Sequence, residues 1–264
     1  MQRRSFLSSA ILLAGGLSLT VGSQAQVVNL NDAINKSGRQ RMLSQRLVKA
    51  YLQIGMDVET AASKKILDQS MATFDRQLIE LRVFASDASL RTTLSDIDKL
   101  WLNYKQLLVG KAPNPRDAKS LLLLSEDLLH MADQATSLLE KQAGSKGGKL
   151  VNLAGRQRML SQRMAKYYQA LQWEVAPANA HQMLEQARKE FVAAQATLNA
   201  ASGTQTSIRD QLMLAQSQWV FFDAALHQAA DSRNHRQSAS NVATTSERIL
   251  EVMDRVTDLY QQLA

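Results

Sequence analysis

The sequence contains no cysteine, which excludes a disulfide framework and any thiolate metal or redox site. Proline and glycine are scarce, with 3 and 11 residues among 264, and aromatic residues make up only 5% of the chain. Proteins built of many short strands and turns are richer in these residues. Hydrophobic residues nevertheless reach 45%, enough to bury a core and to disfavour intrinsic disorder. The composition therefore predicts an all-α protein.

The first 25 residues are typical of a targeting segment. Arg3 and Arg4 precede an apolar stretch over residues 10–21, and the small-x-small sequence of residues 23–25 follows it. These are the parts of a secretory signal, and the string RRSFL also resembles a twin-arginine signal, so both export routes stay open. The apolar stretch is short for a spanning helix, which needs roughly 20 residues. We expect a signal peptide over residues 1–25 and a soluble periplasmic protein, with an uncleaved N-terminal anchor as the alternative.

The sequence GRQRMLSQR occurs twice without change, at residues 38–46 (box 1) and 155–163 (box 2). Similarity extends well beyond the boxes, because SEDLLHMAD at 125–133 aligns with SERILEVMD at 246–254. Further landmarks follow in the same order in both copies: Asn35 and Asn152, Lys49 and Lys166, Tyr51 and Tyr168, Phe74 and Phe191, Trp101 and Trp219. Long self-similarity of this kind indicates a tandem duplication.

Helix-breaking residues divide each copy into four segments of helical length. The expected helices span 28–55, 58–84, 88–110 and 116–142 in the first copy, and 149–174, 177–201, 205–230 and 236–263 in the second. Leucine and methionine recur at spacings of three and four in the last helix of each copy, as expected for a core face. The sequence therefore predicts two tandem four-helix bundles, over 26–143 and 149–264, joined by a flexible glycine-rich linker at 144–148.

The boxes lie in two segments that contain lysine and arginine but no acidic residue, which creates a field that attracts anions. On a helical wheel, Arg41 and Arg158 each lie in a largely uncharged stripe opposite the core face of their helix. Gly38 and Gly155 precede them by one turn, at a cost of about 1 kcal/mol relative to alanine, and would let another backbone come close. We therefore expect the boxes to pack together across a pseudo-two-fold axis.

In such a seam Arg41 and Arg158 would face each other, and two unpaired buried guanidinium groups are costly unless an anion bridges them. The planar guanidinium fork fits planar oxyanions through paired N–H···O hydrogen bonds. The alternative is that the arginines form an ordinary solvated or salt-bridged surface, and that the boxes serve packing alone.

The extended boxes, NKSGRQRMLSQRL and NLAGRQRMLSQRM, resemble the periplasmic nitrate-binding box of NarX-type sensor kinases. They look still more like the N-terminal ligand-binding domain of type IV pilus methyl-accepting chemotaxis transducers, the PilJ type, present as two tandem copies. The resemblance implies a helical bundle that holds nitrate or nitrite between paired first helices. It implies that Arg41 and Arg158 bind the anion, flanked by Gly38, Gly155, Met42 and Met159. We expect these six residues to form the ligand site, with Lys36, Arg39, Arg46, Arg156 and Arg163 as secondary anion-binding candidates.

Two features depart from the family pattern: Leu153 replaces Lys36 in the second copy, and Arg39 and Arg156 stand where the sensor kinases usually have a small residue. Family members also continue into membrane and signalling segments, whereas this chain stops at Ala264. We therefore expect an exported receptor-like protein that binds nitrate or nitrite and acts on a membrane-bound sensor or transducer. The alternative is a ligand-free interaction or adaptor module for a chemosensory, pilus or sensor-kinase partner.

Other functions have little support in the sequence. The four histidines are scattered outside metal-binding motifs, and no nucleotide-binding or nucleophile motif occurs, so we expect no enzymatic activity, no cofactor and no metal. Nucleic-acid binding is disfavoured because the boxes lack aromatic residues between their arginines. Membrane-surface binding through two basic amphipathic helices remains an alternative, although it requires them to leave the bundle.

Overall fold

The computed structural model describes residues 26–203, 205–227 and 234–263, and the segment expected to be a signal peptide lies outside them. The described residues form helices and no strand, which confirms the all-α class. The helices are α1 (Leu30–Gly55), α2 (Thr60–Phe84), α3 (Ala88–Leu108), α4 (Pro115–Ala143), α5 (Lys146–Gln172), α6 (Ala180–Ala201), α7 (Thr206–His227) and α8 (His235–Leu263). None of the described helices is both long enough and apolar enough to cross a membrane.

Helix boundaries follow from local capping chemistry. The side chains of Asn29 and Asn114 accept hydrogen bonds from the third backbone N–H after them and so begin α1 and α4. Gly144, with φ of 60°, ends α4 in the left-handed conformation that glycine tolerates best. Ser145 caps α5 at once by accepting from the N–H of Gly148. The flexible linker expected at 144–148 is therefore wrong in extent, because residues 146–148 are already helical.

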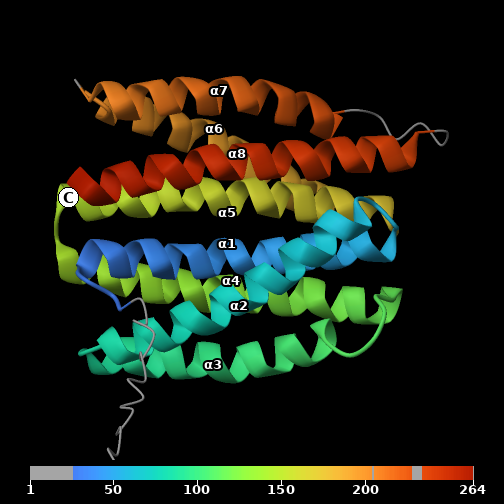
Figure 1. Ribbon diagram of the computed structural model, residues 1–264, viewed down its shortest axis with the longest axis horizontal. Coiled ribbons are helices and arrows are strands. Elements are labelled where there is room, and N and C mark those ends of the chain that lie inside the picture. Colours follow the sequence, from blue (N-terminus) through green and yellow to red (C-terminus); the bar gives the residue numbers. More distant parts are fainter. Residues whose placement is uncertain (1–25, 204, 228–233, 264) are drawn as a thin grey trace, which may run out of the picture.

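The chain folds into two bundle-like halves, α1–α4 and α5–α8, as predicted. Figure 1 shows α3 at one edge of the molecule and α7 at the opposite edge, with α1 and α5 in the middle. Helix α1 packs against α2, α4 and α5, and α5 packs against α1, α6 and α8. We call the contact between α1 and α5 the seam. Because the seam joins the two box-bearing helices, the boxes meet, as the sequence predicted.

The duplicated aromatic residues occupy equivalent core positions in the two halves. Phe74 stacks on Trp101 with ring centroids 4.1 Å apart, and Phe191 stacks on Trp219 at 4.6 Å. These contacts fasten α2 to α3 and α6 to α7. The central helices have packed neighbours on several sides, so most residues of α1 and α5 are buried. The polar and charged box residues consequently need partners inside the protein.

Candidate functional site

The two box arginines lie beside each other in the seam. Arg41 and Arg158 are 1% and 0% exposed. A Cβ atom at Gly38 would lie 3.2 Å from Nη2 of Arg41 and 3.7 Å from Nη2 of Arg158. At Gly155 the corresponding distances are 3.1 Å to Arg158 and 3.7 Å to Arg41. The glycines therefore make room for both guanidinium groups, whereas the sequence had suggested that they make room for the opposite backbone.

Arg41 is held by one residue from each half. Its Nη1 donates to Oδ1 of Asp133 on α4 at 2.6 Å. Its Nη2 crosses the seam and donates to Oδ1 of Asn152 on α5 at 2.6 Å and to the carbonyl oxygen of the same residue at 3.3 Å. Asn152 is fixed in turn by donating to Glu140. Arg41 therefore has a counter-charge from its own half and neutral acceptors from the other.

Arg158 repeats this arrangement in the second half. Its Nη1 donates to Oδ1 of Asp254 on α8 at 2.5 Å, and its Nη2 donates to Oδ1 of Asn35 on α1 at 2.7 Å. Burial lowers the pKa of Arg158 to about 10, although the charge of Asp254 opposes this effect. The expectation of two unpaired guanidinium groups is wrong, because the last helix of each half supplies a carboxylate to its own arginine.

A glutamate on α8, two turns before Asp254, joins the halves through a second set of contacts. Glu247 accepts hydrogen bonds from Arg46 and from the buried Lys49, both on α1. Lys49 also donates to the hydroxyl of Ser246 at 3.1 Å. Burial by itself would raise the pKa of Glu247, but the charges of Lys49 and Arg46 lower it to about 2. This carboxylate is therefore ionised at neutral pH and bridges the two halves.

The pseudo-symmetric position on α4 carries Glu126. It accepts from Arg163 at 2.5 Å and from the buried Lys166 at 2.6 Å, both on α5, and Ser125 accepts from Lys166 at 3.0 Å. Burial lowers the pKa of Lys166 to about 8, against the charge of Glu126, which raises it. Each half thus reaches across the seam to the last helix of the other half.

The remaining basic residues proposed from the sequence have their own acidic partners. Arg39 pairs with Asp254 at 2.8 Å, and Arg156 pairs with Glu190 at 2.8 Å. Lys36 pairs with Asp32 and Glu80, at 3.1 and 2.9 Å, rather than with a seam residue. Met42 and Met159 are buried in the apolar core. The structure therefore brings together Arg41, Arg158, Gly38 and Gly155, with the other arginines around them.

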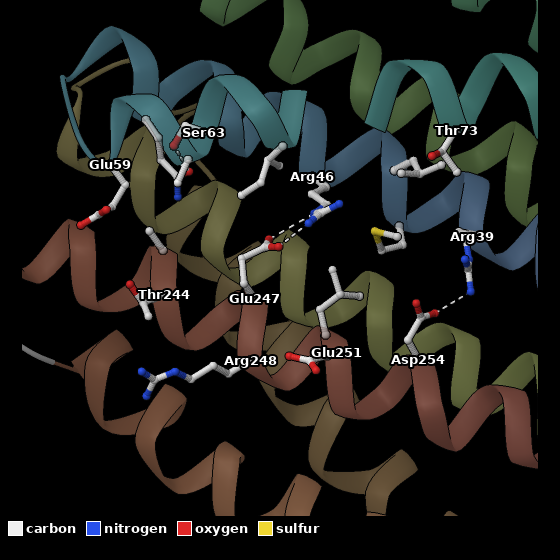
Figure 2. Close-up of a pocket in the computed structure, with 17 residues that line it drawn as sticks. Arg39, Arg46, Glu59, Ser63, Thr73, Thr244, Glu247, Arg248, Glu251 and Asp254 are labelled. Carbon is white, nitrogen blue, oxygen red and sulfur yellow. Dashed lines mark hydrogen bonds and ion pairs between the residues drawn. The ribbon is translucent and has the colours of Figure 1, made fainter. Parts of the chain in front are cut away.

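A groove of about 540 Å³ adjoins the seam between α1, α2 and α8. Its apolar lining includes Met42, Leu43, Ile66 and Leu250. Figure 2 shows the ion pairs of Arg46 with Glu247 and of Arg39 with Asp254 along this groove. The basic side chains that line it on α1 are thus already neutralised by acids of α8.

Side chains that bind metals do not gather in the described parts of the chain. No group of three or more histidine, aspartate or glutamate residues there could hold a metal ion. His130, His227 and His235 are exposed, and each makes a hydrogen bond with a polar neighbour. The most deeply buried charged side chains among the described residues lie on α1 and α5: Arg41, Lys49, Arg158 and Lys166.

The acids of α4 and α8 that neutralise the boxes were not among the residues predicted from the sequence. These residues are Glu126, Asp133, Glu247 and Asp254. All four lie in the aligned segments 125–133 and 246–254, whose first serine, glutamate and final aspartate are the same in both copies. Charged residues retained at corresponding positions of a duplication were the available signal.

Comparison with protein families agrees with this duplicated architecture. The model of the type IV pili methyl-accepting chemotaxis transducer N-terminal domain, PilJ, matches residues 24–125 and again residues 141–245. The chain belongs to the PilJ family. Its two family matches correspond to the two halves, which confirms the prediction of two tandem PilJ copies. No curated protein and no solved structure matches the chain. PilJ is a sensory domain family of chemoreceptors and not a catalytic family.

Proposed function

We propose that this PilJ protein is a helical interaction module of a chemosensory system, whose two boxes hold the bundle halves together without a bound ligand. Its partner would be a transducer, pilus or sensor-kinase component in the periplasm. Family membership supports the chemosensory setting. The reciprocal pairing of Arg41 and Arg158 with acids and asparagines supports a structural role for the boxes.

The observation that carries this proposal is the neutralisation of both central arginines. If the two buried arginines were unpaired, the seam would need an anion to offset the cost of their charges. Asp133 and Asp254 already relieve that cost, at 2.6 and 2.5 Å from the guanidinium nitrogens. An entering anion would also meet the negative charge of these carboxylates. The simplest function of the boxes is therefore to fasten α1 to α5.

A second candidate function is the binding of nitrate or nitrite between the arginines. No described residue accepts a hydrogen bond from Nε of Arg41 or Arg158, although both atoms are buried. A small planar anion would supply the missing acceptors. The side chains of Asp133 and Asp254 are 40% and 35% exposed, so both could turn to solvent and release the arginines. This candidate would relate the chain to the NarX-type sensors.

Thermal unfolding of the chain and of the variants Arg41→Ala and Arg158→Ala separates the two functions. The scans would compare nitrate, nitrite, chloride and sulfate at constant ionic strength. For an interaction module, both variants unfold at lower temperature than the unaltered chain without any anion, and no anion stabilises selectively. For an anion receptor, nitrate or nitrite at 100 times its dissociation constant adds about 2.7 kcal/mol, and both variants lose this gain.

The matched control is Arg255→Ala on α8. Arg255 is exposed, and it contacts Glu251 one turn away and Gln211 on α7, both outside the seam. Loss of such a surface arginine usually changes stability by less than about 0.5 kcal/mol. A comparable loss of stability in Arg255→Ala and Arg158→Ala would remove the structural role proposed for the boxes.

A further inference from the structure

Helix α7 presents large apolar side chains on its outer side. Met213, Leu214, Val220 and Phe221 are 60%, 38%, 58% and 63% exposed. Their spacing places them along one side of the helix, around Ser217. We call these five residues the α7 surface. Figure 1 shows α7 at the edge of the molecule, far from the seam between α1 and α5.

The duplication provides an internal comparison for this surface. Helix α3 is the counterpart of α7, because Leu94, Trp101 and Tyr104 are buried at the same positions as Leu212, Trp219 and Phe222. The residues of α3 that correspond to the α7 surface are Ser95, Asp96, Lys99, Leu102 and Asn103.

Four of these five α3 residues are polar, and Lys99 forms a surface ion pair with Asp96 at 2.8 Å. A helix in this position of the bundle therefore folds well with a polar outer side. The apolar side chains of α7 are not required by the packing of their own half, and their exposure to water is unfavourable. A second surface that covers them would account for their presence.

The α7 surface is symmetric about Ser217. Large apolar residues lie three and four positions before it, at Leu214 and Met213, and three and four positions after it, at Val220 and Phe221. Two copies of such a helix, packed antiparallel about a two-fold axis at Ser217, bring Met213 against Phe221 of the partner subunit. They also bring Leu214 against Val220 of the partner subunit. A symmetric contact between identical chains requires this kind of self-complementary pattern.

The chemistry of the surface also suits a second copy of the chain. Residues 211–222 contain no charged side chain, so two identical surfaces do not repel each other. Ser217 is small and allows close approach of two helices, and its hydroxyl already donates to the carbonyl oxygen of Met213 at 3.1 Å. Its burial therefore leaves no donor without an acceptor.

We infer that the chain forms a homodimer through the α7 surface, with the two α7 helices antiparallel across a two-fold axis near Ser217. The contact is independent of the function proposed for the boxes. It joins the molecules edge to edge and leaves the seam, the groove beside α2 and the polar α3 edge uncovered. Contacts formed by one helix from each chain bury a modest area, so the dimer dissociates on dilution.

The first test uses the absence of cysteine from the chain. In Ser217→Cys the only thiol lies at the proposed axis, and a short bismaleimide linker should yield a covalent dimer at high protein concentration. Lys99→Cys, at the matching position of α3, is the control and should stay monomeric under the same treatment. Equal cross-linking of the two variants, or none in Ser217→Cys, overturns the inference.

The second test is sedimentation equilibrium over a wide range of protein concentration. We expect the unaltered chain to pass from monomer to dimer as its concentration rises. The double variant Leu214→Asp/Phe221→Asn gives α7 the residues of α3 and should remain monomeric, with an unchanged helical circular dichroism spectrum. Leu102→Asn on α3 should still dimerise. A chain that is monomeric throughout, or a double variant that dimerises like the unaltered chain, contradicts the inference.

Discussion

The substitution Asp254→Asn tests the electrostatics of the seam most sharply. Asp254 accepts from Nη1 of Arg158 at 2.5 Å and from Nη2 of Arg39 at 2.8 Å. Asparagine keeps the shape of the side chain but removes its charge, and so leaves the 0% exposed Arg158 without its counter-ion. Removal of one partner from a buried ion pair costs about 3–5 kcal/mol. Water screens part of this loss because Asp254 is 35% exposed, so we expect about 3 kcal/mol.

A loss of this size corresponds to a fall of about 6–12 °C in the unfolding temperature for a chain of this length. Circular dichroism in a buffer free of nitrate and nitrite would measure it. Glu251→Gln is the matched control, because Glu251 lies one turn away on α8, is 72% exposed and pairs with the exposed Arg255 rather than with a seam residue. We expect the control to change stability by less than about 0.5 kcal/mol. An Asp254→Asn variant as stable as the unaltered chain would refute the assignment of Asp254 as the counter-ion of Arg158.

The remaining predictions concern pH and packing. Lys49 and Arg46 lower the pKa of Glu247 from 4.5 to about 2 against the effect of burial, so its contribution is complete above pH 4.5 and disappears as the pH falls from 4.5 to 2. Acid titration of unfolding free energy should show a shallower loss in Glu247→Gln, whereas the exposed control Glu251→Gln should follow the unaltered chain. Burial lowers the pKa of Lys166 from 10.5 to about 8, so the buried charge destabilises the fold below pH 8 and this cost is relieved as the pH rises to 10.5. The unfolding free energy of the unaltered chain should therefore rise over this pH range, and an equal rise in Lys166→Met would contradict this. Gly38→Ala should destabilise by about 1 kcal/mol in urea unfolding despite the better helix propensity of alanine, because the new Cβ would lie 3.2 Å from Nη2 of Arg41, which is already fixed by its hydrogen bonds to Asn152. A more stable variant would show that Arg41 can move aside.

Helix order and the meeting of the boxes could be predicted because both depend on local or repeated features. Leucine and methionine spacing marked the core faces, and breakers such as Pro113 and Pro115 marked helix ends. The uncharged stripe around Arg41 correctly indicated a second packed side of α1. The predicted onset of α5 at 149 lies three residues after the observed start at Lys146, because Gly147 and Gly148 are typical of a linker.

The neutralisation of the arginines could not be predicted in the same way. A helical wheel gives the direction of a side chain but does not identify what lies there. Asp133 is 92 residues from Arg41 along the chain, and the two meet only because α4 packs against α1. Without such acids, two buried arginines require an external anion. The repeat alignment contained the missing information, since Asp133 and Asp254 are corresponding residues.

Differential scanning calorimetry in buffer free of nitrate and nitrite tests most directly whether the boxes fasten the halves. We expect a single transition whose calorimetric enthalpy equals its van't Hoff enthalpy, since the halves should unfold together. The double variant Arg41→Gln/Arg158→Gln should unfold at lower temperature or in two separate transitions. Two transitions in the unaltered chain that merge only when nitrate or nitrite is added would contradict ligand-independent fastening and would establish the anion as the missing part of the seam.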